Sequence, residues 1–92
     1  MQIRLSEKAM QDLFEISIYT LNNWGEKQKD RYLTYIQKRL DTIATYPRHG
    51  KLIQEYLGFE KRILTLKHHI VLYYLIADLV YIDRIINHNI NI

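Results

Sequence analysis

Residues 60–86 read EKRILTLKHHIVLYYLIADLVYIDRII, and this stretch contains three predicted strands separated by two short breaks. Residues 60–66 and 79–86 show the two-residue alternation of a strand. Residues 69–76 are apolar at nearly every position, which predicts a central strand covered on both faces. The dipeptide Ala77-Asp78 marks a tight turn between the second and third strands. Because the breaks are short, we expect the three strands to form an antiparallel meander.

The chain before this stretch changes from a two-residue to a helical period. Gln2–Leu5 alternates and predicts a short strand, and Ser6 can then cap a helix over Glu7–Trp24. The apolar residues of that helix fall on one side of a helical wheel, which predicts a single broad buried face. They are Ala9, Met10, Leu13, Phe14, Ile16, Leu21 and Trp24, while Asp12 lies on the other side.

A second helix is predicted over Glu26–Thr45. Its apolar face consists of Tyr32, Leu33, Ile36, Leu40, Ile43 and Ala44. Gly25 is free to adopt positive φ between the two helices, and such a short link predicts an antiparallel helical hairpin. Pro47 ends the second helix, because helices usually end before the residue that precedes a proline. Arg48–Gly58 then reads as a connecting segment.

The predicted fold class is therefore α+β, with the order β-α-α-β-β-β. The antiparallel sheet is packed on one face by the N-terminal helical hairpin, because the hairpin must bury its apolar faces against the sheet. We expect residues 1–92 to form a single domain, since the chain is short. The opposite face of the sheet is left open, and an open face beside basic residues is where we expect function.

Composition excludes several classes of protein. The 92 residues are 48% hydrophobic and 25% charged, as in an ordinary globular protein. There is no cysteine, which excludes disulfides, thiol catalysis and Cys-ligated zinc. The longest apolar run, Ile70–Ala77, is far too short to span a bilayer. We see no signal peptide, and we expect a cytoplasmic protein with no membrane association.

The charge of the chain is concentrated in one window. The net charge is +3, and residues 48–69 carry all of this excess. The window holds Arg48, Lys51, Lys61, Arg62 and Lys67 against Glu55 and Glu60. Such a window suggests an acidic partner, either nucleic acid or an acidic protein segment. The alternative is a set of solvated surface cations.

The sequence offers little catalytic chemistry. There is no glycine-rich phosphate loop and no metal-binding spacing, so no cofactor and no metal are expected. His68 and His69 would point to opposite faces of a strand, which argues against a shared metal site. Arg62 and Arg84 stand among apolar neighbours within predicted strands, where each either forms a structural salt bridge or presents a guanidinium on the open face.

Three tyrosines in the last strands allow two interpretations. They are Tyr73, Tyr74 and Tyr81. Tyrosines in such strands usually belong to the core or its rim, and only a minority of them stack against ligands.

Several short motifs follow one another along almost the whole chain. They are Leu5-Ser6-Glu7-Lys8-Ala9, Trp24-Gly25, Tyr32-Leu33, Tyr46-Pro47-Arg48-His49-Gly50-Lys51, Lys61-Arg62-Ile63-Leu64, His68-His69-Ile70-Val71-Leu72-Tyr73-Tyr74 and Asp83-Arg84-Ile85-Ile86-Asn87-His88. In this order and spacing they resemble the RelE/ParE superfamily of bacterial toxins. Within it, the chain is most similar to the ParE-type plasmid-stabilisation toxins.

The resemblance implies a toxin of a type II toxin–antitoxin pair. A small cognate antitoxin would wrap the toxin with its C-terminal segment, and the toxin would meet operator DNA only through that antitoxin. ParE-type members are associated with poisoning of DNA gyrase, which implies a binding toxin without catalytic residues. We expect the target or the antitoxin to contact Arg62, Lys67, His68, His69 and Arg84.

RelE-type members of the superfamily provide the alternative function, because they cleave mRNA in the ribosome with arginines, lysines and a tyrosine. This chain departs from their pattern. His69 stands where they carry an arginine, and no arginine, lysine or tyrosine follows Ile86. Asn87 stands where ParE-like chains tend to carry histidine. If the chain cleaves RNA, His69, His88 and Arg84 would supply the proton transfer and the cation. A member that binds only its antitoxin is the third possibility.

Overall fold

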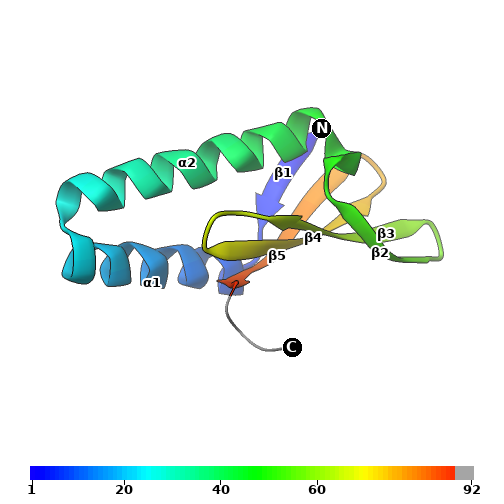
Figure 1. The fold of residues 1–92 in the computed structure, drawn as a ribbon. Coiled ribbons are helices and arrows are strands. Elements are labelled where there is room, and N and C mark those ends of the chain that lie inside the picture. Colours follow the sequence, from blue (N-terminus) through cyan, green and yellow to red (C-terminus); the bar gives the residue numbers. More distant parts are fainter. Residues whose placement is uncertain (89–92) are drawn as a thin grey trace.

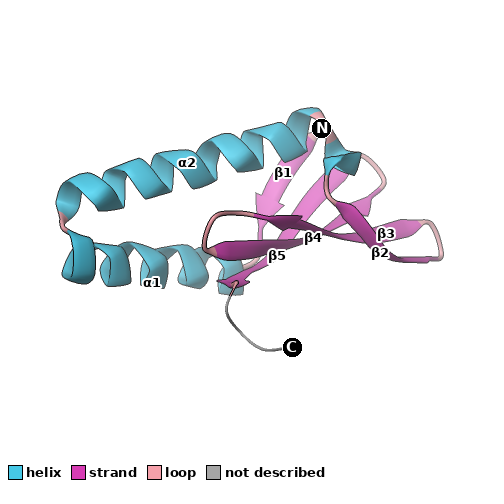
Figure 2. Ribbon diagram, viewed as in Figure 1, coloured by secondary structure: helices cyan, strands magenta, loops and turns pink. Residues whose placement is uncertain are grey.

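The computed structural model describes residues 1–88, and its elements follow the predicted order with one addition (Figures 1 and 2). The elements are β1 (Gln2–Leu5), α1 (Glu7–Trp24), α2 (Glu26–Thr45), the 3-10 turn η1 (Pro47–His49), β2 (Lys51–Tyr56), β3 (Phe59–Thr65), β4 (His69–Ile76) and β5 (Leu79–Asn87). The predicted α+β class, with a helical hairpin packed against a sheet, is confirmed.

Local chemistry sets the limits of the two helices. The Ser6 hydroxyl accepts a hydrogen bond from the Ala9 amide at 2.9 Å, which caps α1 as predicted. Gly25 has a φ of 90°, a conformation that glycine adopts without strain, and it joins α1 directly to α2. The two helices therefore run antiparallel, side by side, and extend beyond one end of the sheet (Figure 1).

The five strands form one mixed sheet in the order β1-β5-β4-β3-β2. β2 to β5 pair in an antiparallel manner, and β1 adds to β5 in parallel. β4 lies in the centre of the sheet, as predicted, but the prediction that both of its faces are covered is wrong. Val71, Tyr73 and Leu75 are buried, whereas the residues between them are only half-buried. Among residues 1–88, the helices cover one face of the sheet and leave the other open.

The predicted connecting segment Arg48–Gly58 contains a strand that the sequence analysis missed. β2 pairs with β3 at the edge of the sheet, and all its residues are exposed. An edge strand exposed on both sides has no core face, so no alternation of buried and exposed positions is imposed on its sequence. The turn that follows uses Leu57 and Gly58, both with positive φ.

The core lies between the hairpin and the covered face of the sheet. Its buried residues are Ala9, Ile16, Tyr32, Ile36, Leu40, Ile43, Leu64, Leu66, Val71, Tyr73, Leu75, Val80, Ile82 and Ile85. The predicted face of α2 is confirmed at its centre, because Tyr32, Ile36, Leu40 and Ile43 are all buried.

The predicted buried face of α1 is partly wrong. Phe14 and Trp24 leave 66% and 70% of their surface exposed, whereas Asp12 is buried. The reason is that α1 packs mainly along β5 and against α2, so only a narrow strip of the helix is covered. That strip consists of Ala9, Asp12, Ile16 and Thr20.

Candidate functional site

A groove of about 840 Å³ lies between the helical hairpin and one end of the sheet. Its walls come from α1, from the first part of α2, from the histidines where β4 begins and from residues 84–87 of β5. Tyr19 and Trp24 line it with rings that are 65% and 70% exposed. The groove thus combines ionisable side chains with exposed aromatic rings, which is the composition of a binding surface.

Asp12 of α1 is held against the end of β5. Strand β1 ends at Leu5. Farther along β5, beyond the end of β1, the Asp12 carboxylate accepts a hydrogen bond from the Ile85 amide at 2.9 Å. The Arg84 guanidinium donates to both oxygens of the same carboxylate, at 2.8 and 2.9 Å. Burial opposes ionisation of Asp12, but the bonds from Arg84 and Ile85 outweigh it and lower the pKa of Asp12. The carboxylate in turn raises the pKa of Arg84, so the pair is charged at neutral pH.

Tyr32 of α2 forms a second polar contact in the groove. Its hydroxyl lies 2.7 Å from Nδ1 of His69, the first residue of β4. Burial raises the pKa of Tyr32 to about 12, so the hydroxyl keeps its proton. Burial, together with the neighbouring His68, lowers the pKa of His69. At neutral pH the His69 imidazole is therefore uncharged, and its Nδ1 shares a hydrogen bond with the Tyr32 hydroxyl.

The tandem histidines do not point apart as predicted. The rings of His68 and His69 both have their centroids 5.6 Å from the centroid of Tyr32. The reason is that His68 precedes β4 and lies in a bend, so the alternation of a strand does not apply to it. Both imidazoles therefore belong to the groove.

Arg62 lies in a different polar network, at the corner between η1 and β2. Its side chain is only 11% exposed and donates to Glu60 at 2.8 Å. It also donates to the carbonyl oxygens of Arg48 and Gly50, at 3.1 and 2.6 Å. Arg48 binds the other oxygen of Glu60 at 2.9 Å. Hydrogen bonds from Arg62 and then Arg48 lower the pKa of Glu60, so this network is charged and its carboxylate is shared by two arginines.

Tyr73 also belongs to the corner between η1 and β2. Its hydroxyl donates to the Pro47 carbonyl at 2.7 Å and accepts from the Gly50 amide at 2.8 Å. A Cβ atom at position 50 would collide with the Tyr73 hydroxyl and lie 2.7 Å from the Ile63 carbonyl oxygen. Only glycine fits there, so the corner is a structural joint with no space for a ligand.

The structure therefore separates the predicted contact residues. His68, His69 and Arg84 line the groove together. Arg62 belongs to the corner network, so of its two alternatives the guanidinium on the open face is wrong. Lys67 is exposed beside the groove, with its Nζ atom 5.1 Å from the centroid of the Tyr35 ring.

The salt-bridge alternative holds for both strand arginines. Arg84 pairs with Asp12 and Arg62 pairs with Glu60. The partner of Arg84, Asp12, lies on α1 and not in the sheet.

The basic window of residues 48–69 does not form one surface. Arg48 and Arg62 are bound to Glu60, Lys51 begins the edge strand β2, and Lys61 projects from the open face of β3. Of the window's cations, Lys67 alone stands next to the groove. The reason is that neighbouring positions of a strand point to opposite faces, so a cluster in sequence becomes dispersed in space.

Three residues of the groove were missed as site residues. Tyr32 and Trp24 were assigned to the buried faces of their helices, and Asp12 to solvent. A buried tyrosine usually has its hydroxyl hydrogen-bonded, so a tyrosine on the buried face of α2 gave some indication that Tyr32 has a polar partner. Asp12 gives none, because its partner Arg84 lies 72 positions along the chain.

Residues 1–88 contain no group of three or more His, Cys, Asp or Glu side chains that could hold a metal ion. None of the helices in the same part of the chain is long and apolar enough to cross a membrane.

Two comparisons identify relatives of this chain. The model of the family described as "ParE toxin of type II toxin-antitoxin system, parDE" matches residues 3–92. A solved structure described as "Chromosomal ParDE TA system from P. aeruginosa" has the same fold, with a TM-score of 0.78, 19% sequence identity and 95% of each chain covered. No curated protein sequence matches. Because the family match spans nearly the whole sequence, the chain belongs to the ParE toxin family of type II toxin–antitoxin systems.

Proposed function

We propose that this toxin arrests growth by binding DNA gyrase, without performing chemistry on it, and that a cognate antitoxin neutralises it. Membership of the ParE family supports this target over the ribosome. The observation that carries the proposal is the state of the groove, where two of the three candidate catalytic groups, Arg84 and His69, are already bonded to other side chains. Arg84 is bound to Asp12, and His69 is bound to Tyr32.

These bonds work against the alternative, ribosome-dependent cleavage of mRNA. Cleavage needs a proton donor with a pKa near neutrality and a cation free to meet the charge on the phosphate. Tyr32 has a pKa of about 12, and the pKa of His69 is lowered. The Arg84 charge is neutralised by Asp12 within 2.8 Å. The arrangement suits recognition of a protein surface better than acid–base chemistry.

The margin of the groove is the surface that we propose for gyrase. Lys67 and His68 are exposed there, and Trp24, which also lines the groove, is 70% exposed. Tryptophan, tyrosine and arginine supply most of the binding energy in protein interfaces, and a cation next to them favours an acidic partner. We propose Trp24, Lys67 and His68 as the main contacts, with Arg84 and His69 holding the groove in shape.

The outer surface of α1 is the site that we propose for the antitoxin. Its exposed apolar side chains are Met10, Phe14, Ile18, Tyr19, Leu21 and Trp24. An apolar antitoxin segment that covers this surface would extend into the groove, because Tyr19 and Trp24 belong to both. The antitoxin would then neutralise the toxin by occupying the surface that gyrase needs. Acidic residues of the antitoxin would meet Lys67.

The cellular setting follows from this proposal. Gyrase acts in the cytoplasm, so we propose that residues 1–92 work there as one domain. Operator DNA would be reached only through the antitoxin, and a plasmid that carries the pair would be stabilised by it.

The target is tested with purified proteins. Supercoiling by gyrase is measured with added toxin, and translation is measured in a cell-free extract with the same toxin. We expect supercoiling to be inhibited and translation to continue. Intact supercoiling together with blocked translation would move the function to the ribosome, and the mRNA would then be examined for cleavage.

The proposed surface is tested by a matched pair of variants. Trp24→Ala should weaken both gyrase inhibition and binding of the antitoxin, which we expect to be the product of the short adjacent gene. Tyr46→Ala is the control, because Tyr46 is 66% exposed but lies at the other end of α2. If Trp24→Ala binds both partners as the unchanged toxin does, neither site includes the groove.

A further inference from the structure

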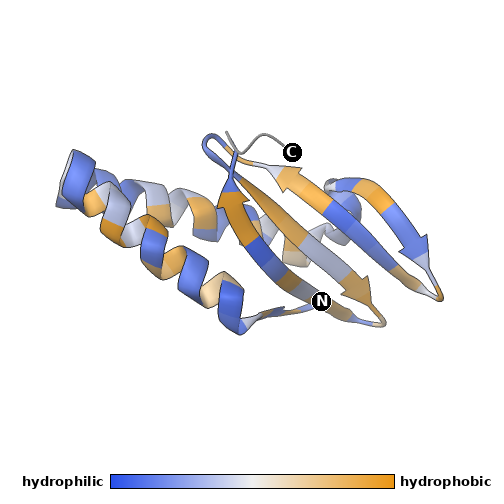
Figure 3. Ribbon diagram, turned by 90° about the horizontal axis from the view of Figure 1, so that it is seen from below, coloured by the Kyte–Doolittle hydropathy of each residue, from blue (hydrophilic) through white to orange (hydrophobic). Residues whose placement is uncertain are grey.

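The turn between β3 and β4 lies at the end of the sheet that faces the helical hairpin, and it carries Lys67 and His68. Figure 3 shows it as a hydrophilic loop at that end. The Leu66 amide donates to the His69 carbonyl at 2.7 Å, so Lys67 and His68 are the two residues at the tip of this hairpin. Both side chains are exposed. The tip therefore presents two of the proposed target contacts to a partner.

The backbone of this tip lacks the conformation that usually fixes a two-residue turn. Such turns favour positive φ in one or both of their central residues, because this conformation matches the twist of the strands. Leu57 and Gly58 have it between β2 and β3, and Ala77 has it between β4 and β5. Neither Lys67 nor His68 has it. This tip therefore depends more on contacts from outside its hairpin than the other two turns do.

Two tyrosines of α2 make such contacts. Tyr32 and Tyr35 lie about one helical turn apart and stack, with ring centroids 5.7 Å apart. The Nζ atom of Lys67 lies 5.1 Å from the centroid of the Tyr35 ring. The centroid of the His68 ring lies 5.6 Å from that of Tyr32. Each residue at the tip is thus next to one ring of the stacked pair.

The two residues at the tip are held differently. The His88 amide donates to the His68 carbonyl at 2.9 Å, which fixes the backbone of His68. Lys67 forms no salt bridge and no side-chain hydrogen bond with any of residues 1–88. A tyrosine ring attracts an ammonium group over its face. The Tyr35 ring is therefore what orients the Lys67 charge in the free toxin.

We infer that Tyr35 is a positioning residue, which holds Lys67 in the orientation that meets an acidic surface of the target. A free lysine side chain has many rotamers and loses their entropy when it is bound. Contact with the ring restricts Lys67 before the target arrives, so less entropy is lost on binding. Tyr35 acts through Lys67 and needs no contact with the target itself. The inference rests on the proposed function, in which Lys67 and His68 meet gyrase.

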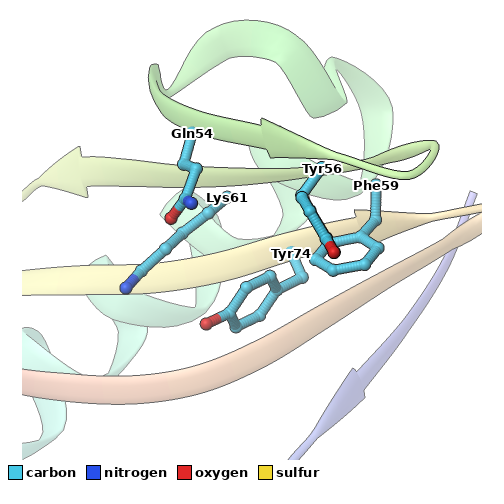
Figure 4. Close-up of a pocket in the computed structure, with 5 residues that line it drawn as sticks. All are labelled: Gln54, Tyr56, Phe59, Lys61 and Tyr74. Atoms are coloured by element: carbon cyan, nitrogen blue, oxygen red, sulfur yellow. The ribbon is translucent and has the colours of Figure 1, made fainter.

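A second lysine–tyrosine contact provides the matched control. Figure 4 shows Lys61 extended beside the ring of Tyr74, and the Nζ atom of Lys61 lies 6.0 Å from the ring centroid. These two residues are paired in the register of β3 and β4, so the strands already fix both of them. We therefore expect removal of the Tyr74 ring to leave the tip at Lys67 and the activity of the toxin unchanged.

The order of the tip is tested by limited digestion with trypsin, which cleaves after lysine and arginine. Mass spectrometry measures cleavage after Lys67 relative to cleavage after Lys51 on the edge strand, which corrects for a general loss of stability. Tyr35→Leu should raise this ratio about threefold, the size of an exposed contact between a cation and a ring. Tyr35→Phe and Tyr74→Leu should leave the ratio unchanged, because the first keeps the ring and the second lies in a regular ladder. If Tyr35→Leu fails to fold by circular dichroism, Tyr35→Met takes its place.

The effect on activity is tested by a double-mutant cycle, read out as growth arrest on induction and as inhibition of purified gyrase. Tyr35→Leu should raise the amount of toxin needed for half of either effect about threefold, and Tyr35→Phe should match the unchanged toxin. Once Lys67→Gln is present, Tyr35→Leu should have no further effect.

Three results would overturn the inference: additive effects of Tyr35→Leu and Lys67→Gln, equal losses in Tyr35→Phe and Tyr35→Leu, or an unchanged trypsin ratio in Tyr35→Leu. If the unchanged toxin arrests growth without inhibiting gyrase, the proposed target alone is wrong, and growth arrest then decides the role of Tyr35.

Discussion

Arg62 and Arg84 lie on β3 and β5, the two strands that flank β4, and they pair with adjacent residues of β4. They nevertheless belong to two very different regions. The Arg62 side chain is 11% exposed, and its partners are Glu60 and two backbone carbonyls. The Arg84 side chain is 37% exposed, and it is hydrogen-bonded to Asp12 at the wall of the groove. The corner around Arg62 is closed by its own bonds, and the region around Arg84 opens to solvent.

The difference shows that two arginine–carboxylate pairs can have different roles. One pair holds the backbone in place, and the other sets the shape of a groove. In the corner, Arg62 fixes the backbone of η1 and of Gly50, the residue before β2, because it bonds directly to the carbonyl oxygens of Arg48 and Gly50. In the groove, Asp12 and Arg84 join α1 to the end of β5 and thereby set the distance between the walls. A strand arginine is thus no sign of a binding site until its partners and its exposure are known.

The largest effect is expected from Arg62→Ala. Removing one partner of a nearly buried pair leaves Glu60 and two carbonyl oxygens short of donors, which should lower the free energy of unfolding by about 3 kcal/mol. Urea denaturation followed by circular dichroism measures it. Lys51→Ala, on the exposed edge strand, should change that free energy by less than about 0.5 kcal/mol. Equal effects of the two substitutions would show that the corner is not closed.

Arg84→Ala should cost about half as much, roughly 1.5 kcal/mol of unfolding free energy, because Asp12 keeps the Ile85 amide and solvent reaches the site. A double-mutant cycle with Asp12→Asn isolates the pair. We expect a coupling free energy of about 1 kcal/mol in urea denaturation. Strictly additive effects would mean that α1 is held against β5 by apolar packing alone.

Tyr32→Phe removes only a hydroxyl from the groove. It deletes the hydrogen bond to His69 and leaves the buried ring in place, so the free energy of unfolding should fall by about 1 kcal/mol. Thermal melting at neutral pH measures it. The matched change in the corner, Tyr73→Phe, removes two bonds and should cost more. The comparison fails if the order of the two is reversed.

The two regions should also lose stability at different pH, and this is the smallest effect. The folded pKa of His69 is lowered from 6.5, so its contribution is present above pH 6.5 and is lost as pH falls from there toward the folded value. The folded pKa of Glu60 is lowered from 4.5 and that of Asp12 from 3.8, so the corner loses stability only below about pH 4.5, and the Asp12–Arg84 pair of the groove adds to this lower step. Unfolding free energies measured from neutral to acid pH should show both steps, and His69→Gln should remove the upper one alone.

Most elements of the fold could be predicted because they obey local rules. The helices Glu7–Trp24 and Glu26–Thr45 have the predicted limits, since a cap, a glycine and a proline mark them in the sequence. The strand His69–Ile76 also has the predicted limits, because its apolar run ends at the turn Ala77-Asp78. Strand β2 could not be predicted, because a strand at the edge with both sides in solvent has no pattern of burial to detect. The parallel addition of β1 to β5 depends on contacts between the two ends of the chain.

The site could be predicted less well, for a related reason. His68, His69 and Arg84 were named as contact residues, and they do meet in the groove. Arg62 was also named as a contact residue, because its neighbours along the chain do not show that Glu60 and two carbonyls enclose it. The role of Asp12 could be identified only from the tertiary structure, which shows its bonds to Arg84 and Ile85. Local sequence indicates which residues are unusual, and the fold determines which of them remain free to act.

The pairing of β1 with β5 affects when this toxin can fold during its synthesis on the ribosome. The first strand to be synthesised finds its place beside residues 79–82, so the sheet is complete only when almost the whole chain has been made. Contacts so distant in sequence form late in folding. Until then, the apolar faces of α1 and α2 have no sheet to cover. We therefore expect a nascent chain that is interrupted before β5 to lack the complete sheet and to be exposed to proteases.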